Sequence, residues 1–126
     1  MLKKTSPVYT LMLIALIGLT ACSARFDRQT YERELIHDGE NLYLENCARC
    51  HELDGGGFSD IYPNLAGNPI VTLHDPVPII QTVLNGQGSM PAFKNSLTAE
   101  ETAAILSYIR NAWEHSAPVV YPKQVQ

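Results

Sequence analysis

Three residues near the middle of the chain have types and spacing that can do covalent and metal chemistry. Cys47, Cys50 and His51 follow one another in the order Cys-x-x-Cys-His. Two thiols three residues apart can each add to a vinyl group of one haem and form two thioether bonds. The adjacent histidine would then be held beside the iron as an axial ligand. The motif therefore predicts covalent attachment of one c-type haem.

Three other kinds of site use the same residue types. A zinc site could take Cys47 and Cys50 but needs two further ligands. The remaining histidines are His37, His74 and His115, and they form no paired metal-binding pattern. A thioredoxin-like dithiol expects a strand–helix–strand context, which the sequence does not indicate. A plain disulfide between the two cysteines would leave the adjacent histidine without a role. These three sites stay open as alternatives.

A second candidate ligand lies in the loop Gly86-Gln87-Gly88-Ser89-Met90-Pro91. An electron-transfer haem is closed by a methionine or by a second histidine. Glycines allow backbone to approach a porphyrin closely, and Pro91 stiffens the position of its neighbour. Met90 is the expected sixth ligand, with His74 as the runner-up and core filling as its other possible role. His74 is otherwise expected at the surface or against a haem propionate, and His37 and His115 are expected in solvent.

The chain begins with a segment typical of an export signal. Lys3 and Lys4 precede a nearly unbroken apolar run over residues 8–19, which fits a signal peptide and is short for a membrane span. The run ends in Leu19-Thr20-Ala21-Cys22, which resembles the lipobox of bacterial lipoproteins. The resemblance implies that residues 1–21 are removed and that Cys22 carries a lipid. Acyl chains there would anchor the protein on the periplasmic side of a bacterial membrane.

Composition fits one small exported domain. The 126 residues are enough for a single domain of ordinary size. Removing Lys3 and Lys4 with the signal would leave seven basic residues against 13 acidic ones. That balance argues against a nucleic-acid partner, which needs a basic surface. Processing would also remove Met1 and Met12, so Met90 would be the single methionine left.

Helical periodicity surrounds these motifs, and no strand pattern is present, which predicts an all-α domain. Apolar residues recur at helical spacing from residue 35 up to the cysteine motif. Asp75-Pro76 begins a second helix, and Asn85-Gly86 ends it. Thr98-x-x-Glu101 has the form of a capping box, and helical spacing continues from there to Trp113.

Taken together, these residues resemble class I c-type cytochromes over about residues 35–113. Gly39 and Tyr43 look like that family's contact on the N-terminal helix, and Ile105 and Tyr108 look like its partners on the C-terminal helix. The resemblance implies a small all-α class I cytochrome c fold. Its N- and C-terminal helices would cross, and the chain would wrap around one covalent haem c.

The resemblance also implies contacts around the haem. Pro63-Asn64-Leu65 is similar to the segment whose proline carbonyl accepts the imidazole Nδ1–H, so Pro63 is expected to orient His51. Glu52 departs from the family, in which many members have glycine directly after the motif. Trp113 would either cap the helix pair or reach toward the haem. The stretch over residues 63–90 is similar to cytochrome modules of periplasmic dehydrogenases and haem–copper oxidases.

The expected organisation is a lipoprotein signal peptide over residues 1–21, a flexible tether over 22–31, the cytochrome c domain over 32–116 and an extended tail over 117–126. With both axial positions filled, one-electron transfer between redox partner proteins is expected, with no small-molecule substrate and no catalysis by the domain itself. The alternative is a fixed haem subunit of a periplasmic dehydrogenase or terminal oxidase. A haem peroxidase or ligand sensor, in which Met90 leaves the iron, is the enzyme-class alternative.

Overall fold

The computed structural model describes residues 7–58 and 61–126, with side chains from Phe26 onward. The chain divides into two units, Met1–Glu32 and Arg33–Gln126. Helix α1 runs from Pro7 to Asn46, so residues 22–31, expected to be a flexible tether, are helical instead. Residues 1–6 of the expected signal peptide and the side chain of Cys22 lie outside the described residues. Among the described helices, none combines the length and hydropathy needed to cross a bilayer.

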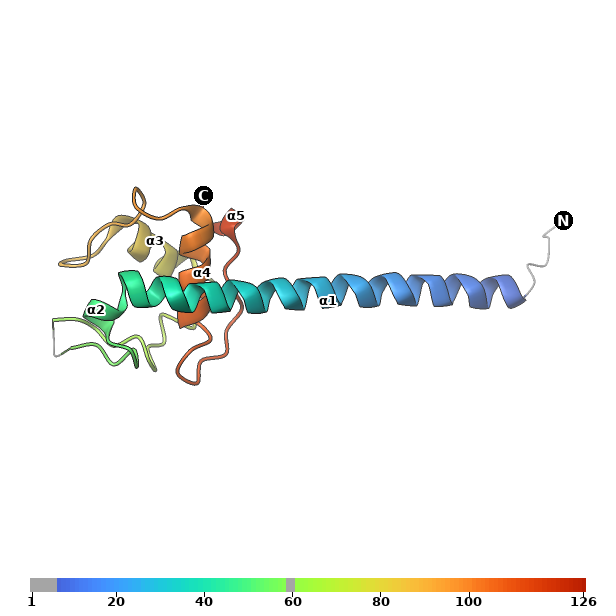
Figure 1. Ribbon diagram of the computed structural model, residues 1–126, viewed down its shortest axis with the longest axis horizontal. Coiled ribbons are helices and arrows are strands. Elements are labelled where there is room, and N and C mark those ends of the chain that lie inside the picture. The colour runs from blue at the N-terminus through green and yellow to red at the C-terminus, as the bar shows by residue number, and fades with distance from the viewer. Residues whose placement is uncertain (1–6, 59–60) are drawn as a thin grey trace. The chain divides into compact units, whose positions relative to one another are not determined.

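The second unit consists of helices joined by long irregular segments (Figure 1). The end of α1 is followed by α2 (Ala48–His51), α3 (Val77–Asn85), α4 (Ala99–Ile109) and α5 (Pro122–Val125). Across the described ranges, β-type pairing is limited to two isolated bridges, Phe58–Tyr62 and Gln87–Met90. The expected all-α class is confirmed.

Helices α1 and α4 cross at a glycine. A Cβ at Gly39 would overlap the backbone carbonyl of Ala104 and would also press on the Cβ of Tyr108. Only a residue without a side chain allows backbones to approach this closely. One turn further along α1, the ring of Tyr43 meets that of Tyr108 with their centroids 5.4 Å apart. Ile105, the neighbour of Ala104, is buried beside this contact.

The starts of α3 and α4 follow the capping signals in the sequence. Asp75 Oδ1 accepts a hydrogen bond of 3.1 Å from the N–H of Val77, the first residue of α3. At α4, Glu101 N–H donates to Thr98 Oγ1, and Thr98 N–H donates to the Glu101 carboxylate. The N–H and the hydroxyl of Thr98, which both donate to the Glu101 carboxylate, hold the pKa of Glu101 below its ordinary value. Helix α4 ends at Ile109, so the helical spacing that continues to Trp113 overstates its length.

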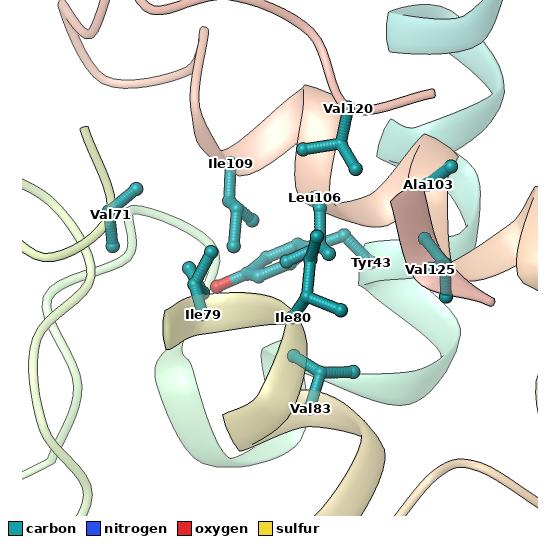
Figure 2. Packing of buried hydrophobic residues seen from close by; sticks show 10 residues of the cluster. All are labelled: Tyr43, Val71, Ile79, Ile80, Val83, Ala103, Leu106, Ile109, Val120 and Val125. Atoms are coloured by element: carbon teal, nitrogen blue, oxygen red, sulfur yellow. The ribbon is translucent and has the colours of Figure 1, made fainter. Parts of the chain in front are cut away.

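The hydrophobic core lies where α1, α3 and α4 meet, and Figure 2 shows the ring of Tyr43 in the middle of it. Each helix contributes one apolar face, which is the usual arrangement for amphipathic helices around a small core. The buried members are Tyr43, Val71, Ile79, Ile80, Val83, Ala103, Leu106, Ile109, Val120 and Val125.

The C-terminal segment packs onto α4, whereas the sequence predicts an extended, loosely held tail. Val120 is 0% exposed, and Val125 in the short helix α5 belongs to the same core. Ser107 Oγ donates to the carbonyl of Val120 at 3.1 Å and accepts from its N–H at 2.9 Å. Prolines correctly indicate the lack of a long helix here, but they do not reveal that two valines fill the core.

Candidate functional site

The cysteine–histidine motif sits at a break between two helices. α1 ends at Asn46, and Cys47 precedes the single turn of α2. The carbonyl of Cys47 accepts hydrogen bonds from the N–H groups of Cys50 and His51, at 3.1 and 3.0 Å. This tight turn brings both thiols and the imidazole to the wall of the same cavity.

That cavity has a volume of about 500 Å³. Cofactor pockets in proteins are typically of roughly 300–1,000 Å³, with mostly apolar walls and a few placed polar groups. Its walls come from the motif, from the loop after it, from one face of α3, from the methionine loop and from α4. The lining residues include Tyr43, Cys47, Cys50, His51, Pro63, Leu65, Val71, Ile79, Val83, Met90, Phe93, Ile105 and Ile109.

His51 is held in one orientation by a backbone carbonyl. The side chain is 8% exposed, and its Nδ1 lies 2.9 Å from the carbonyl oxygen of Pro63. Because a carbonyl only accepts, Nδ1 carries the proton in this contact and Nε2 keeps its lone pair. A donor–acceptor contact of this kind is the usual way in which a metal-binding histidine is oriented.

The Pro63 carbonyl that contacts His51 is itself held in place by close packing against Gly57. Gly57 has φ +69°, and a Cβ there would overlap the carbonyl of Tyr62 and the backbone of Pro63. Its N–H donates to the carbonyl of His51 at 3.1 Å, so the loop closes back on the motif. A residue with a side chain at position 57 would therefore displace the carbonyl that orients the imidazole.

Met90 reaches the cavity from a tight turn after α3. Gln87 N–H donates to the carbonyl of Met90 at 3.1 Å, and Met90 N–H donates to that of Gln87 at 2.9 Å. Phe93 N–H donates to the carbonyl of Val83 at 3.0 Å, which ties the loop back to α3. Met90 is partly buried against the core and lines the cavity.

The two thiols are not joined to each other in this site. Burial raises the pKa of Cys47 to about 11, and the neighbouring Cys50 adds to the shift. Cys47 and Cys50 are both free, so no disulfide joins them. No group of three or more His, Cys, Asp or Glu residues among the described side chains could hold a metal ion. The described residues thus lack the further ligands that a zinc site needs, whereas two thiols, an imidazole and a thioether around one apolar cavity fit a covalent haem.

The remaining predicted residues divide between the cavity and the helix crossing. Tyr43 and Ile105 line the cavity as well as the crossing, while Gly39 and Tyr108 lie only at the crossing. Tyr43 donates its hydroxyl to the carbonyl of Glu52 at 2.6 Å, and burial raises its pKa above the ordinary value. Glu52 has φ +61°, the conformation for which glycine is favoured at this position.

Trp113 caps the helix pair and does not line the cavity. Its ring lies 5.4 Å from that of Tyr43 and 5.9 Å from that of Tyr108, both edge-on. Its Nε1–H donates to the carbonyl of Leu53 at 3.2 Å, which ties the turn after α4 to the loop after the motif. The sequence left two roles open for Trp113, and in the structure it caps the helix pair and does not reach toward the haem cavity.

His115 is not in solvent as the sequence predicts. Its Nε2 accepts a hydrogen bond of 2.9 Å from Gly67 N–H, and its Nδ1 lies 2.8 Å from the carbonyl of Ile109. The bridge holds a turn in which Trp113 and Glu114 have positive φ values of 50° and 67°. Such backbone is strained for residues other than glycine and persists only where contacts hold it. His37 and His74 are exposed, as expected, and neither lines the cavity.

Comparison with known proteins identifies the family of this chain. Residues 34–109 match the family described as cytochrome c oxidase, cbb3-type, subunit III. The chain belongs to this cytochrome c family. As a cytochrome c domain it binds one covalent haem c and transfers electrons, and it is not itself the catalytic part of an enzyme.

The relatives of this cytochrome c domain include subunits of dehydrogenases and small cytochromes. The alcohol dehydrogenase (quinone) cytochrome c subunit of Gluconobacter oxydans is 37% identical over 91 residues, which are 64% of this chain and 19% of that protein. The gluconate 2-dehydrogenase cytochrome c subunit of Pantoea cypripedii is 33% identical over 91 residues, which are 63% of this chain and 21% of that protein. The chain therefore spans about a fifth of these dehydrogenase subunits. Cytochrome c6 of Microcystis aeruginosa is 35% identical over 74 residues, 57% of this chain and 90% of that protein.

Proposed function

We propose that this domain is a one-electron carrier in a bacterial respiratory or dehydrogenase chain. In this proposal Cys47 and Cys50 hold the haem through thioether bonds, and His51 and Met90 are its axial ligands. The observation that carries the proposal is the single cavity of about 500 Å³ lined by all four side chains. When bound, the haem supplies the ferric–ferrous couple.

The residues around the cavity have distinct tasks in this proposal. The carbonyl of Pro63 orients His51 and makes its imidazole a stronger donor, through the 2.9 Å contact at Nδ1. The thioether of Met90 fills the other axial position and favours the ferrous form. With both positions filled, no coordination site is left for a substrate. The apolar walls exclude water and favour the ferrous form further.

The test of this ligand set is the pair of variants Met90→Ala and Met90→His. Met90→Ala is expected to open an axial position, to bind carbon monoxide rapidly in the ferrous state and to lose the weak long-wavelength band of iron–thioether ligation. Met90→His is expected to stay six-coordinate with a lower potential, because imidazole favours ferric iron more than a thioether does. Ser89→Ala, in the same turn, is the matched control and keeps the wild-type spectrum.

Two results would contradict this proposal. If Met90→Ala keeps the wild-type spectrum and potential, another residue such as His74 is the ligand. If the wild-type ferrous protein binds carbon monoxide rapidly, Met90 leaves the iron, and a peroxidase or ligand sensor becomes the better assignment.

A fixed haem subunit is the second candidate, and the names of the relatives favour it. The Gluconobacter oxydans and Pantoea cypripedii relatives are cytochrome c subunits of dehydrogenases, and a relative from Azospirillum brasilense is the cbb3-type cytochrome c oxidase subunit CcoP. Purification in mild detergent separates the two forms. A fixed subunit co-purifies with its dehydrogenase or oxidase in constant stoichiometry, whereas a free carrier elutes alone.

We further propose that the protein is exported and anchored on the periplasmic side of a membrane by a lipid on Cys22. Leu19-Thr20-Ala21-Cys22 at the end of the apolar run supports this location. Cys22→Ala is expected to move the cytochrome into the soluble periplasmic extract or to leave an unprocessed precursor, while Ser23→Ala stays in the membrane fraction. A soluble wild-type protein with an unmodified N-terminus would contradict the anchor and leave the haem site untouched.

A further inference from the structure

His115 connects the turn after α4 to the loop that orients His51. Its Nε2 accepts the hydrogen bond of 2.9 Å from Gly67 N–H, and its Nδ1 lies 2.8 Å from the carbonyl of Ile109. Because a carbonyl only accepts, Nδ1 carries the proton, and Nε2 offers its lone pair to Gly67. The two contacts together therefore require the neutral imidazole in a single tautomer.

The loop over residues 63–68, which His115 holds, is closed by its own side chains. The amide nitrogen of Asn68 donates to the carbonyl of Asn64 at 3.1 Å, so the two ends of the loop are tied together. Pro63, its first residue, supplies the carbonyl that lies 2.9 Å from Nδ1 of the haem ligand. A displacement at the outer end of this loop is therefore passed on to the contact that orients the imidazole of the ligand.

The turn after α4 supports this loop at two places. A Cβ at Gly67 would meet none of the described atoms within 4 Å, so the outer end of the loop borders open space and depends on its hydrogen bond. Further in, the carbonyl of Gly55 accepts from the N–H groups of Leu65 and Ala66 at 2.7 and 3.0 Å. A Cβ at Gly55 would lie 2.7 Å from ring atoms of Trp113, which packs against it from the same turn.

The charged groups around His115 are engaged elsewhere or lie in solvent. On its own turn, Arg110 is buried and bound to two backbone carbonyls, and Glu114 is exposed. On the loop after the cysteine motif, Asp54 is exposed and accepts from a backbone N–H. Residues 63–68 contain no titratable side chain. Among the described side chains, His115 takes part in no ion pair. Proton uptake by its own imidazole is thus the event that changes the charge at this contact.

We propose that His115 is a positioning residue for His51, and that proton uptake by its imidazole releases the loop and raises the reduction potential of the haem. Histidine is the side chain whose charge changes between pH 5 and pH 8. When it is protonated, Nε2 carries a hydrogen that faces the N–H of Gly67, so an acceptor is lost and two donors oppose each other. The positive φ values of Trp113 and Glu114 favour the same release, because strained backbone persists only where contacts hold it.

The hydrogen bond of His51 links this loop to the potential. A firm bond from Nδ1–H to the carbonyl of Pro63 makes the imidazole a stronger donor, which stabilises ferric iron. Loosening the loop weakens that bond and shifts the balance toward the ferrous form. Reduction and proton uptake at His115 therefore favour each other, and the potential rises as pH falls. This inference rests on the proposed function, in which His51 is a haem ligand, and it adds a residue outside the cavity that controls the ligand.

The test is a redox titration of the holoprotein between pH 5 and pH 8 with three variants. In the wild type the ferrous-to-ferric ratio is expected to rise by about threefold toward low pH, a shift of about 30 mV. His115→Gln offers a side-chain oxygen to Gly67 and takes up no proton, so its potential should stay at the wild-type value of pH 8. His115→Ala lacks the acceptor at every pH, so its potential should stay near the wild-type value of pH 5. His37→Ala, the control, removes an exposed histidine and should keep the wild-type profile.

Proton exchange at His51 gives a second readout, on the ligand itself. In NMR spectra of the ferrous protein at pH 8, the Nδ1–H of His51 is expected to exchange with solvent faster in His115→Ala than in the wild type. His115→Gln should restore slow exchange. A residue that only stabilises the fold would lower the unfolding temperature and leave the potential and its pH profile unchanged.

Three results overturn this inference and leave the axial ligands in place, provided that the six-coordinate spectrum is intact. They are a flat profile in the wild type, a His115→Gln variant that keeps the full pH dependence, and a His115→Ala variant with the wild-type potential at pH 8. If His115→Ala yields no holoprotein, the comparison of His115→Gln with the wild type decides. Failure of the proposed function appears in a different measurement, since wild-type protein without covalent haem contradicts both.

Discussion

Gly39 lies against the carbonyl of Ala104 so closely that α1 and α4 touch through their backbones. The contact brings the end of α1, which the cysteine motif follows directly, next to α4, which supplies Ile105 and Ile109 to the cavity. The helix crossing thus sets the distance between two walls of the haem site.

Gly39→Ala is expected to destabilise the holoprotein by about 3 kcal/mol, the upper part of the usual range for overpacking, because the new methyl group meets backbone atoms that cannot move aside. The measurement is the free energy of unfolding in guanidinium, followed by far-ultraviolet circular dichroism. Glu40→Ala, one residue along and exposed, is the control and should change stability by less than about 0.5 kcal/mol. Equal effects of the two changes would show that the crossing tolerates a side chain.

Replacing both Cys47 and Cys50 by alanine is expected to abolish covalent haem. Both thiols line the cavity, and neither is engaged in a disulfide. The wild type should have the mass of the chain plus one haem and should keep a haem-stained band after denaturation, which the double variant lacks. Arg49→Ala, between the cysteines and exposed, should keep the haem. An unmodified dithiol in wild-type protein from its native attachment machinery would refute the assignment.

Tyr43→Phe is expected to change how stability depends on alkaline pH. Burial raises the pKa of Tyr43 above the ordinary 10.0, with smaller contributions from Cys47 and Tyr108. The folded state therefore holds the phenolic proton more tightly than the unfolded chain does, so stability falls as pH rises above about 10. Tyr43→Phe should lose this component and, at neutral pH, about 1 kcal/mol from the bond to Glu52. Parallel curves of stability against pH for Tyr43→Phe and wild type would count against the linkage.

His115→Ala is expected to destabilise the protein by about 1–2 kcal/mol, because it removes two hydrogen bonds that hold the turn after α4. Thermal unfolding of the holoprotein measures the loss. His37→Ala removes an exposed histidine and should have almost no effect. If His115→Ala and His37→Ala unfold at the same temperature, the hydrogen bonds of His115 to Gly67 and Ile109 do not stabilise the fold.

The parts of the fold that the sequence predicts are those specified by local chemistry. The capping box of α4 joins Thr98 to Glu101, three positions apart, and the cap of α3 joins Asp75 to Val77, two positions apart. The spacing of these residues alone therefore predicts both caps. The covalent haem is likewise predicted by the order of Cys47, Cys50 and His51, which form one turn of chain.

The parts that the sequence does not predict depend on distant partners. His115 is hydrogen-bonded by Gly67, and Val120 by Ser107, in pairs that no local pattern connects. The burial of Arg110 is also not predicted, because an arginine that follows an amphipathic helix typically lies in solvent. Its burial depends on carbonyls at positions 71 and 118. For residues 22–31, the polar composition predicts irregular chain, but their backbone continues the helix of α1.

The cavity at the centre of the domain makes the haem a part of the core. Without haem the mostly apolar walls of this space of about 500 Å³ would face water, and each large apolar side chain left exposed forgoes about 1.5–3 kcal/mol of burial. The whole stability of a domain is about 5–15 kcal/mol. A chain that has not received its haem is therefore expected to be poorly stable. Such a chain unfolds readily and is then cleaved by proteases. We expect the cellular amount of this protein to follow the supply of haem and of the attachment machinery more than the rate at which the chain is made.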